Sequence, residues 1–110
     1  MFRNTDQVNP NYKEIGRLVE MLAEANIPGS YHQLFDGWQV GYPCLPSEGD
    51  CVCNVIEHFG SRGHNVDLLE IWGLLTEEEN LNNYGTLGYL TAEEVFGRIK
   101  THWEANKDEL

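Results

Sequence analysis

Three cysteines and two histidines lie close together in the middle of the chain, where they could ligate a metal ion: Cys44, Cys51, Cys53, His58 and His64. Structural zinc sites usually pair their ligands at short spacings in tight turns. The cysteines follow the spacing C-x6-C-x-C, and only the two histidines have an ordinary ligand spacing. In an extended strand Cys51 and Cys53 point to one face and His58 to the other. The pattern favours buried cysteines and histidines that flank a turn, and zinc binding stays an alternative.

A cysteine could also act as a nucleophile, with a histidine as its base. Reactive cysteines need a lowered pKa, which a cation, a helix N-terminus or a paired histidine provides. Cys51 follows Glu48 and Asp50, and carboxylates nearby raise the pKa of a thiol instead. No base can be assigned to Cys44 from the sequence. These observations disfavour a thiol enzyme.

Carboxylates beside a histidine offer a third kind of chemistry. Glu57 and His58 adjoin in the chain, and a hairpin would bring them toward Asp67 and Glu70. Such a cluster could hold a divalent cation or act as a general acid–base pair. The chain has neither a calcium-loop pattern nor H-E-x-x-H, and no phosphate loop follows its glycines, so we expect no cofactor. A small metal-dependent hydrolase that uses Glu57, His58 and Asp67 is the alternative that this leaves.

The charge balance is the strongest global signal, with 18 acidic against seven basic residues and a net charge of −11 on 110 residues. This charge disfavours direct binding to nucleic acid and to anionic membranes, and it favours partners with a basic surface. An acidic face can imitate the phosphate track of DNA, although acidity more often only keeps a small protein soluble. The hypothesis selects five glutamates and one aromatic anchor as partner-binding residues: Glu77, Glu78, Glu79, Glu93, Glu94 and Trp38.

The elements that position these residues can be read from periodicity and turn residues. Residues 1–10 are expected to be frayed, and 11–110 to form a single domain. Asn11 and Glu14 have the spacing of a capping box before an apolar stripe that ends at residues 26–29. Strands are expected at 31–35 and 38–42 around Asp36-Gly37, and at 51–59 and 66–72.

Two further capping boxes, at Thr76–Glu79 and Thr91–Glu94, predict a short helix and a final helix. The order of these elements predicts an α+β fold, in which an N-terminal and a C-terminal helix pack on a small antiparallel sheet of three to four strands. The chain shows no apolar export signal and no stretch near the ~20 apolar residues of a membrane helix. Together with an odd number of cysteines, this predicts a cytoplasmic protein with reduced thiols.

Four segments carry a resemblance: LFDGWQ at 34–39, CNVIEH at 53–58, LLEIWGLLT at 68–76 and LTAEEVF at 90–96. Across residues 12–104 the chain is similar to small orphan proteins of prophages and mobile elements of gut-type Firmicutes. The resemblance brings no activity and no functional residue. Because some neighbouring phage products inhibit host defence nucleases, it implies by association an inhibitor of the anti-CRISPR kind.

These observations lead to one hypothesis and two alternatives. The chain is expected to be a non-enzymatic module that binds a basic protein, such as a nuclease or another nucleic-acid-binding protein, as a nucleic-acid mimic. The first alternative is the metal or zinc protein described above. The second is a self-associating subunit, for example a homodimer formed through an exposed sheet edge.

Overall fold

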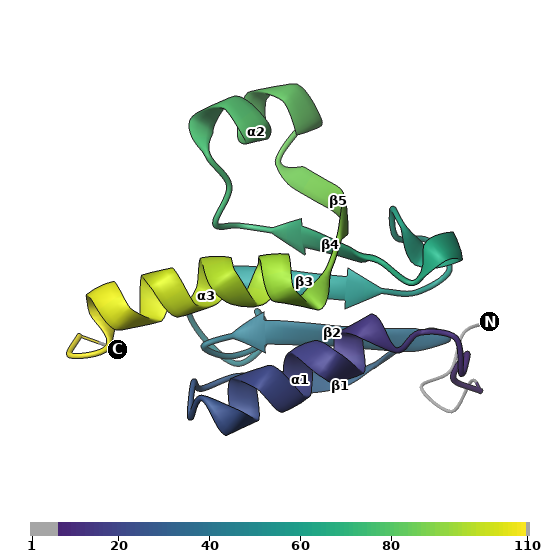
Figure 1. Ribbon diagram of the computed structural model, residues 1–110, viewed down its shortest axis with the longest axis horizontal. Coiled ribbons are helices and arrows are strands. Elements are labelled where there is room, and N and C mark those ends of the chain that lie inside the picture. The colour runs from purple at the N-terminus through teal and green to yellow at the C-terminus, as the bar shows by residue number, and fades with distance from the viewer. Residues whose placement is uncertain (1–6, 110) are drawn as a thin grey trace.

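The computed structural model of the chain describes residues 7–109 and shows an α+β fold. Its helices and strands follow one another as α1 (Glu14–Glu24), β1 (Ser30–Leu34), β2 (Gly37–Tyr42), β3 (Cys53–Glu57), the 3-10 helix η1 (His64–Val66), β4 (Leu69–Trp72), α2 (Glu77–Asn83), β5 (Thr86–Leu90) and α3 (Ala92–Asn106). The five strands form one antiparallel sheet in chain order (Figure 1). Only β1 and β2 are joined by a tight turn, at residues 35–36, and the order of the other strands follows the general tendency of strands that are consecutive in the chain to lie side by side.

The sheet has one strand more than the three to four that the sequence predicts. Residues 86–90 form β5, which pairs with β4 through an irregular register between Leu69 and Ile71. Gly85 and Gly88 flank and interrupt this segment, so it lacks the sustained alternation of apolar and polar residues that predicts a strand. The other strands lie where the sequence places them, although β3 and β4 are shorter than predicted.

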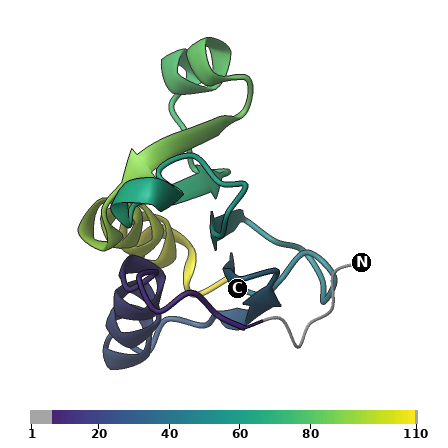
Figure 2. The same ribbon diagram turned by 90° about the vertical axis from the view of Figure 1, so that its right-hand side faces the viewer.

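Helices α1 and α3 cover the same face of the sheet, as Figure 2 shows. The middle of that face is a row of directly opposed residues, Val40, Val55 and Ile71, each at most 2% exposed. Both helices pack apolar side chains onto this row: Ile15, Leu18 and Leu22 from α1, and Ala92, Val95 and Ile99 from α3. Burial of this apolar surface is the main source of stability.

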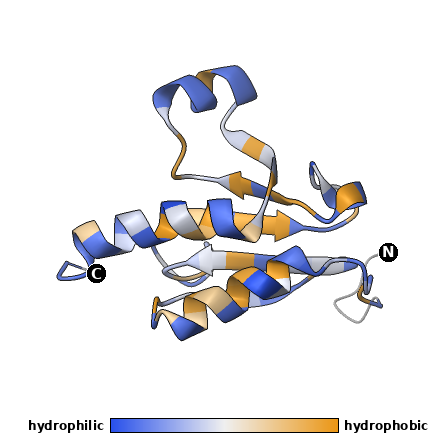
Figure 3. Cartoon of the chain, in the orientation of Figure 1, coloured by the Kyte–Doolittle hydropathy of each residue, from blue (hydrophilic) through white to orange (hydrophobic). Residues whose placement is uncertain are grey.

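The opposite face of the sheet carries polar side chains. Across β1, β2 and β3, His32 contacts Gln39 at 2.7 Å, and Gln39 donates to Asn54 at 2.8 Å. Figure 3 shows β3 and β4 as largely hydrophobic and α2 as mostly hydrophilic. Residues 1–6 of the segment expected to be frayed lie outside the described residues, and the backbone N–H of Asn9 donates to the Asp36 carbonyl at 2.8 Å.

Helix α1 begins at Glu14, two residues later than a capping box with Asn11 as the N-cap predicts. Its N-cap residue, Lys13, makes no side-chain capping bond. The Glu14 carboxylate does not reach back along its own helix; it accepts from the N–H of Ala92 at 2.6 Å, at the start of α3. The predicted capping box of α1 is therefore wrong, because a tertiary contact takes the glutamate that the local motif needs.

Candidate functional site

The short helix α2 stands apart from the rest of the chain, at the end of a loop that leads out from β4 and returns as β5 (Figure 1). We call residues 76–85 the α2 arm. None of the residues of α2 is buried. Leu81 is 72% exposed and Tyr84 is 96% exposed. A large apolar and a large aromatic side chain are thus presented to solvent on a segment that contributes little to the core.

Glu79 attaches the arm to the body of the protein. Its carboxylate accepts two hydrogen bonds from Arg98 of α3, at 2.8 and 2.7 Å, and Arg98 also donates to the Leu74 carbonyl. This pairing lowers the pKa of Glu79 to about 2. The same carboxylate accepts from the Thr76 N–H, while the Thr76 hydroxyl accepts from the Glu79 N–H, which forms the predicted capping box. Glu79 is therefore a structural residue.

Two more of the selected glutamates also have structural partners. The Glu93 carboxylate forms an ion pair with Arg17 of α1, with 2.7 Å between Glu93 Oε2 and Arg17 Nη2. Arg17 forms a second ion pair with Glu14. Glu94 closes the capping box of α3 with Thr91. Within residues 7–109, the side chains of Glu77 and Glu78 make no hydrogen bond or ion pair, and both are exposed. Of the five glutamates, these two keep their charge fully available to a partner.

Trp38 lies apart from the glutamates. It is half-buried in β2, with its ring centroid 5.5 Å from that of Tyr31. Together with Ile15 and Val19 of α1 it lines a hollow of about 330 Å³. Since β3 and β4 separate β2 from β5, the structure does not bring Trp38 and the α2 arm onto one surface.

The cysteines and histidines do not meet. Cys53 lies in the core, where burial raises its pKa to about 12, and burial also raises the pKa of Cys51. His58 accepts from the Gly60 N–H at 2.9 Å, and its ring contacts Phe35 and Phe59. No three His, Cys, Asp or Glu side chains within 7–109 are grouped to hold a metal ion. All three thiols are free.

Glu57 and Asp67 do come together, at the start of α1. Glu57 is fully buried, and one of its carboxyl oxygens accepts from the Ile15 N–H at 3.2 Å, while the other has no hydrogen-bond partner among residues 7–109. Asp67 accepts from the N–H groups of Lys13 and Glu14 at 2.8 and 2.9 Å. Burial, reinforced by the Asp67 carboxylate, raises the pKa of Glu57 to about 9, so this side chain is neutral at pH 7. Because His58 is engaged elsewhere, the predicted trio is only partly assembled.

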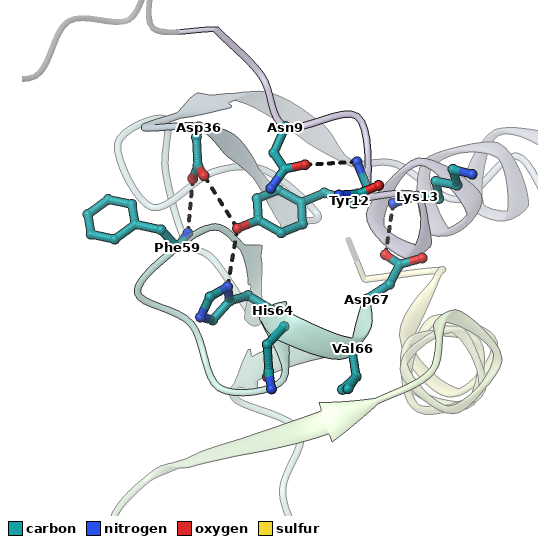
Figure 4. Close-up of a pocket in the computed structure, with 10 residues that line it drawn as sticks. Asn9, Tyr12, Lys13, Asp36, Phe59, His64, Val66 and Asp67 are labelled. Carbon is teal, nitrogen blue, oxygen red and sulfur yellow. Dashed lines mark hydrogen bonds between the residues drawn. The ribbon is translucent and has the colours of Figure 1, made fainter.

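Next to this pair lies a polar cleft of about 600 Å³, drawn in Figure 4. The hydroxyl of Tyr12 lies 3.3 Å from Asp36 Oδ2 and 3.2 Å from His64 Nδ1. The other oxygen of Asp36 accepts from the Phe59 N–H at 2.9 Å. These bonds hold together three segments of the chain: the residues before α1, the turn between β1 and β2, and the connection from β3 to β4. Burial, followed by the Asp36 carboxylate, raises the pKa of Tyr12, which keeps the phenol protonated.

Sequence reasoning did not select Tyr12 or Asp36. Their contacts join residues 24 and 52 positions apart in the chain, so no local spacing indicates them. The only sequence signal was a tyrosine placed directly before an amphipathic helix, which is far too common to single out a site.

Comparison with known proteins finds no relative of this chain. No family model, no curated protein and no solved structure matches the chain. The resemblance to prophage proteins stays a prediction. Among residues 7–109, no helix combines the length and the apolar character that spanning a membrane requires.

Proposed function

We propose that the protein is a binding module whose α2 arm contacts a basic surface of another protein. One observation carries the proposal: the α2 arm buries none of its residues, yet it presents Leu81 and Tyr84 to solvent beside Glu77 and Glu78, which are unpaired among residues 7–109. Exposed large apolar groups that are rimmed by charge commonly mark interaction sites. Tyrosine is enriched among the residues that dominate binding energy at interfaces.

The charge of the arm defines the chemistry of the partner. Glu77 and Glu78 require cationic groups opposite them, and Leu81 and Tyr84 require an apolar hollow between those cations. The net charge of −11 adds long-range attraction, which accelerates encounter with a basic partner and weakens as salt rises. A second copy of this chain is a poor occupant, because two acidic arms repel each other.

The finer form of the proposal is that the partner is a nucleic-acid-binding protein, such as a nuclease, and that the arm occupies its groove as a nucleic-acid mimic. Basic grooves that hold nucleic acid fit the charge that the arm presents. In this form the protein is an inhibitor, and binding of the arm excludes nucleic acid from the partner.

The test begins with capture of partners from the native host on immobilised protein, followed by binding measurements with the purified partner. The arm variant Leu81→Ser/Tyr84→Ser removes the apolar anchors, and Glu77→Lys/Glu78→Lys reverses the charge. Both are expected to weaken binding by at least about tenfold, since each removes contacts worth about 1.4 kcal/mol or more. The matched control is Glu20→Lys/Glu24→Lys, which makes the same charge change on exposed positions of α1.

A partner that binds the arm variants and the control equally would remove the arm from the interface. Competition with duplex DNA tests the finer proposal: DNA and the protein should exclude each other from the partner, and simultaneous binding would contradict mimicry. Sedimentation at low and high salt checks self-association. If the wild type forms a dimer that dissociates in both arm variants, the arm binds a second copy of this chain and not a different protein.

A further inference from the structure

We propose that the cleft around Tyr12 is a separate binding site, and that it takes a guanidinium group. The cleft shares no lining residue with the α2 arm. Three features carry the inference: where the protons of its hydrogen-bond chain lie, the balance of acceptors over donors, and apolar side chains on its rim. The inference does not depend on the function proposed for the arm.

The hydrogen-bond chain fixes the proton positions. Tyr12 has a single hydroxyl proton, and it donates this proton to the Asp36 carboxylate, the stronger acceptor. His64 Nδ1 lies 3.2 Å from the same phenol oxygen, so this nitrogen must carry a proton and donate it. In a neutral imidazole the other ring nitrogen, Nε2, then has only a lone pair. In its neutral form, His64 therefore offers this nitrogen as a hydrogen-bond acceptor.

The charged side chains of the lining are mainly acceptors. Asp36 and Asp67 contribute two carboxylates, each of which retains acceptor capacity after its observed hydrogen bonds. Among the lining residues within 7–109, the single one with a lysine or arginine side chain is Lys13. Figure 4 shows the Lys13 side chain extending away from the Tyr12–His64 hydrogen bond. A ligand that satisfies this lining must supply donors and positive charge.

The rim supplies the apolar surface that a planar cation needs. Phe59 is 47% exposed and Val66 is 56% exposed, and both line the cleft. A guanidinium group is planar, stacks on aromatic rings and donates five N–H groups in a fixed arrangement. An ammonium group offers three donors around one point and gains less from acceptors that come from separate segments. The guanidinium group therefore fits the cleft better.

Such a group can come from a free guanidino compound or from an arginine side chain of a protein partner. Both sources present the same guanidinium group, and two probes distinguish them. L-Arginine amide represents the free compound. A blocked peptide, acetyl-Gly-Arg-Gly-amide, represents a side chain in a protein, because it lacks the free α-amino group.

The experiment is a titration of the full ¹⁵N-labelled chain followed by NMR, with L-arginine amide and its neutral isostere L-citrulline amide. Arginine amide is expected to give saturable shifts of the backbone N–H signals of Phe59, His64 and Lys13, and citrulline amide to give none. Tighter binding of the blocked peptide than of arginine amide assigns the site to a partner's arginine. Binding of arginine amide alone assigns it to a free compound.

Variants test which residues hold the group. Asp36→Asn keeps an acceptor for the Phe59 N–H but removes the charge, and it is expected to weaken binding of arginine amide at least about fivefold. Tyr12→Phe keeps the ring and releases His64 from its partner, and it should weaken binding as well. Glu24→Gln removes one charge from an exposed position elsewhere and is expected to leave binding unchanged.

The proposal is overturned if arginine amide and citrulline amide shift the same signals equally, or if arginine amide produces no saturable shift in the cleft. It is also overturned if Glu24→Gln weakens binding as much as Asp36→Asn, since this would show only general attraction to an acidic protein. Glu77→Lys/Glu78→Lys should bind arginine amide as the wild type does. A result that contradicts the proposal for the cleft can therefore be distinguished from one that contradicts the proposal for the arm.

Discussion

Helices α1 and α2 begin in opposite ways, and the difference separates the two candidate sites. At the start of α2 the backbone is satisfied locally, by the reciprocal bonds between Thr76 and Glu79. At the start of α1 the N–H groups of Lys13, Glu14 and Ile15 are satisfied by carboxyl groups that are 42 to 54 residues away in the chain. A locally capped helix can form without the body of the protein, whereas a remotely capped one forms only with the fold.

This difference has a functional consequence. The α2 arm can change its orientation or partner at little cost to the core, because its helix buries no residue and is tied to the body by the ion pair of Glu79 with Arg98 and by a hydrogen bond from Arg62 to the Asn83 carbonyl. The start of α1 is part of the core and holds the cleft in place, because Asp67 follows directly after the 3-10 helix that carries His64. The arm is suited to contact a large partner, and the cleft to enclose a small group in a fixed geometry.

The largest effect is expected from removal of the remote cap. Asp67→Gly removes the acceptor of two backbone N–H groups, and glycine accepts the left-handed conformation at this position, where φ is 56°. We expect a loss of about 2 kcal/mol in the free energy of unfolding, because two N–H groups lose a charged partner. Denaturant unfolding measures it.

The matched control is Asp67→Asn, which keeps one carbonyl acceptor and tolerates the same backbone conformation. It should lose clearly less stability than Asp67→Gly. Equal losses would show that the carboxylate charge, and not the capping of the N–H groups, stabilises α1.

The second prediction concerns the pH dependence that Glu57 imposes. Its pKa rises from 4.5 to about 9 on folding, so the folded state retains a proton that the unfolded chain releases. The stability associated with this proton is complete below pH 4.5 and is lost as pH rises toward about 9. Glu57→Gln is permanently neutral and keeps the acceptor for Ile15. It should match the wild type near pH 4.5 and exceed its free energy of unfolding by a margin that grows steadily as the pH rises toward 9.

Unfolding curves of both proteins between these pH values check the prediction. A difference in the free energy of unfolding that stays constant across this pH range would contradict the prediction. It would mean that Glu57 is ionised in the folded protein and that a further group stabilises its carboxylate.

The same contrast explains what the sequence could predict. The boxes at Thr76 and Thr91, the hairpin at Asp36 and the stripe of Ile15, Leu18 and Leu22 are local patterns, and the structure confirms them. The caps of α1, the pairing of Glu93 with Arg17 and the cleft around Tyr12 depend on contacts between distant segments. A single sequence shows which residues are acidic, but only the fold shows which carboxylates are already paired. Strand β5 was missed for the related reason that its pairing with β4 compensates for its glycines.

The third prediction applies the comparison to α3, which has a local box like α2 but packs against the core like α1. Thr91→Ala removes the acceptor of the Glu94 N–H. Because Glu14 still accepts from the Ala92 N–H, the expected loss is about 1 kcal/mol, smaller than for Asp67→Gly. Thermal or denaturant unfolding measures the loss, with Thr101→Ala as a control on an exposed position of the same helix. A loss as large as that of Asp67→Gly would contradict the distinction between local and remote caps.

The smallest effect on global stability is expected at the arm itself. Thr76→Ala removes the acceptor of the Glu79 N–H, yet α2 contributes no buried residue to the core. We therefore expect a change of at most about 0.5 kcal/mol in global unfolding, together with faster hydrogen exchange of the α2 amides alone. Hydrogen exchange followed by NMR separates the two, with the amides of α3 as the internal reference. If Thr76→Ala also accelerates exchange in the sheet, then the arm is coupled to the core through Arg98, and the arm and the cleft are no longer independent.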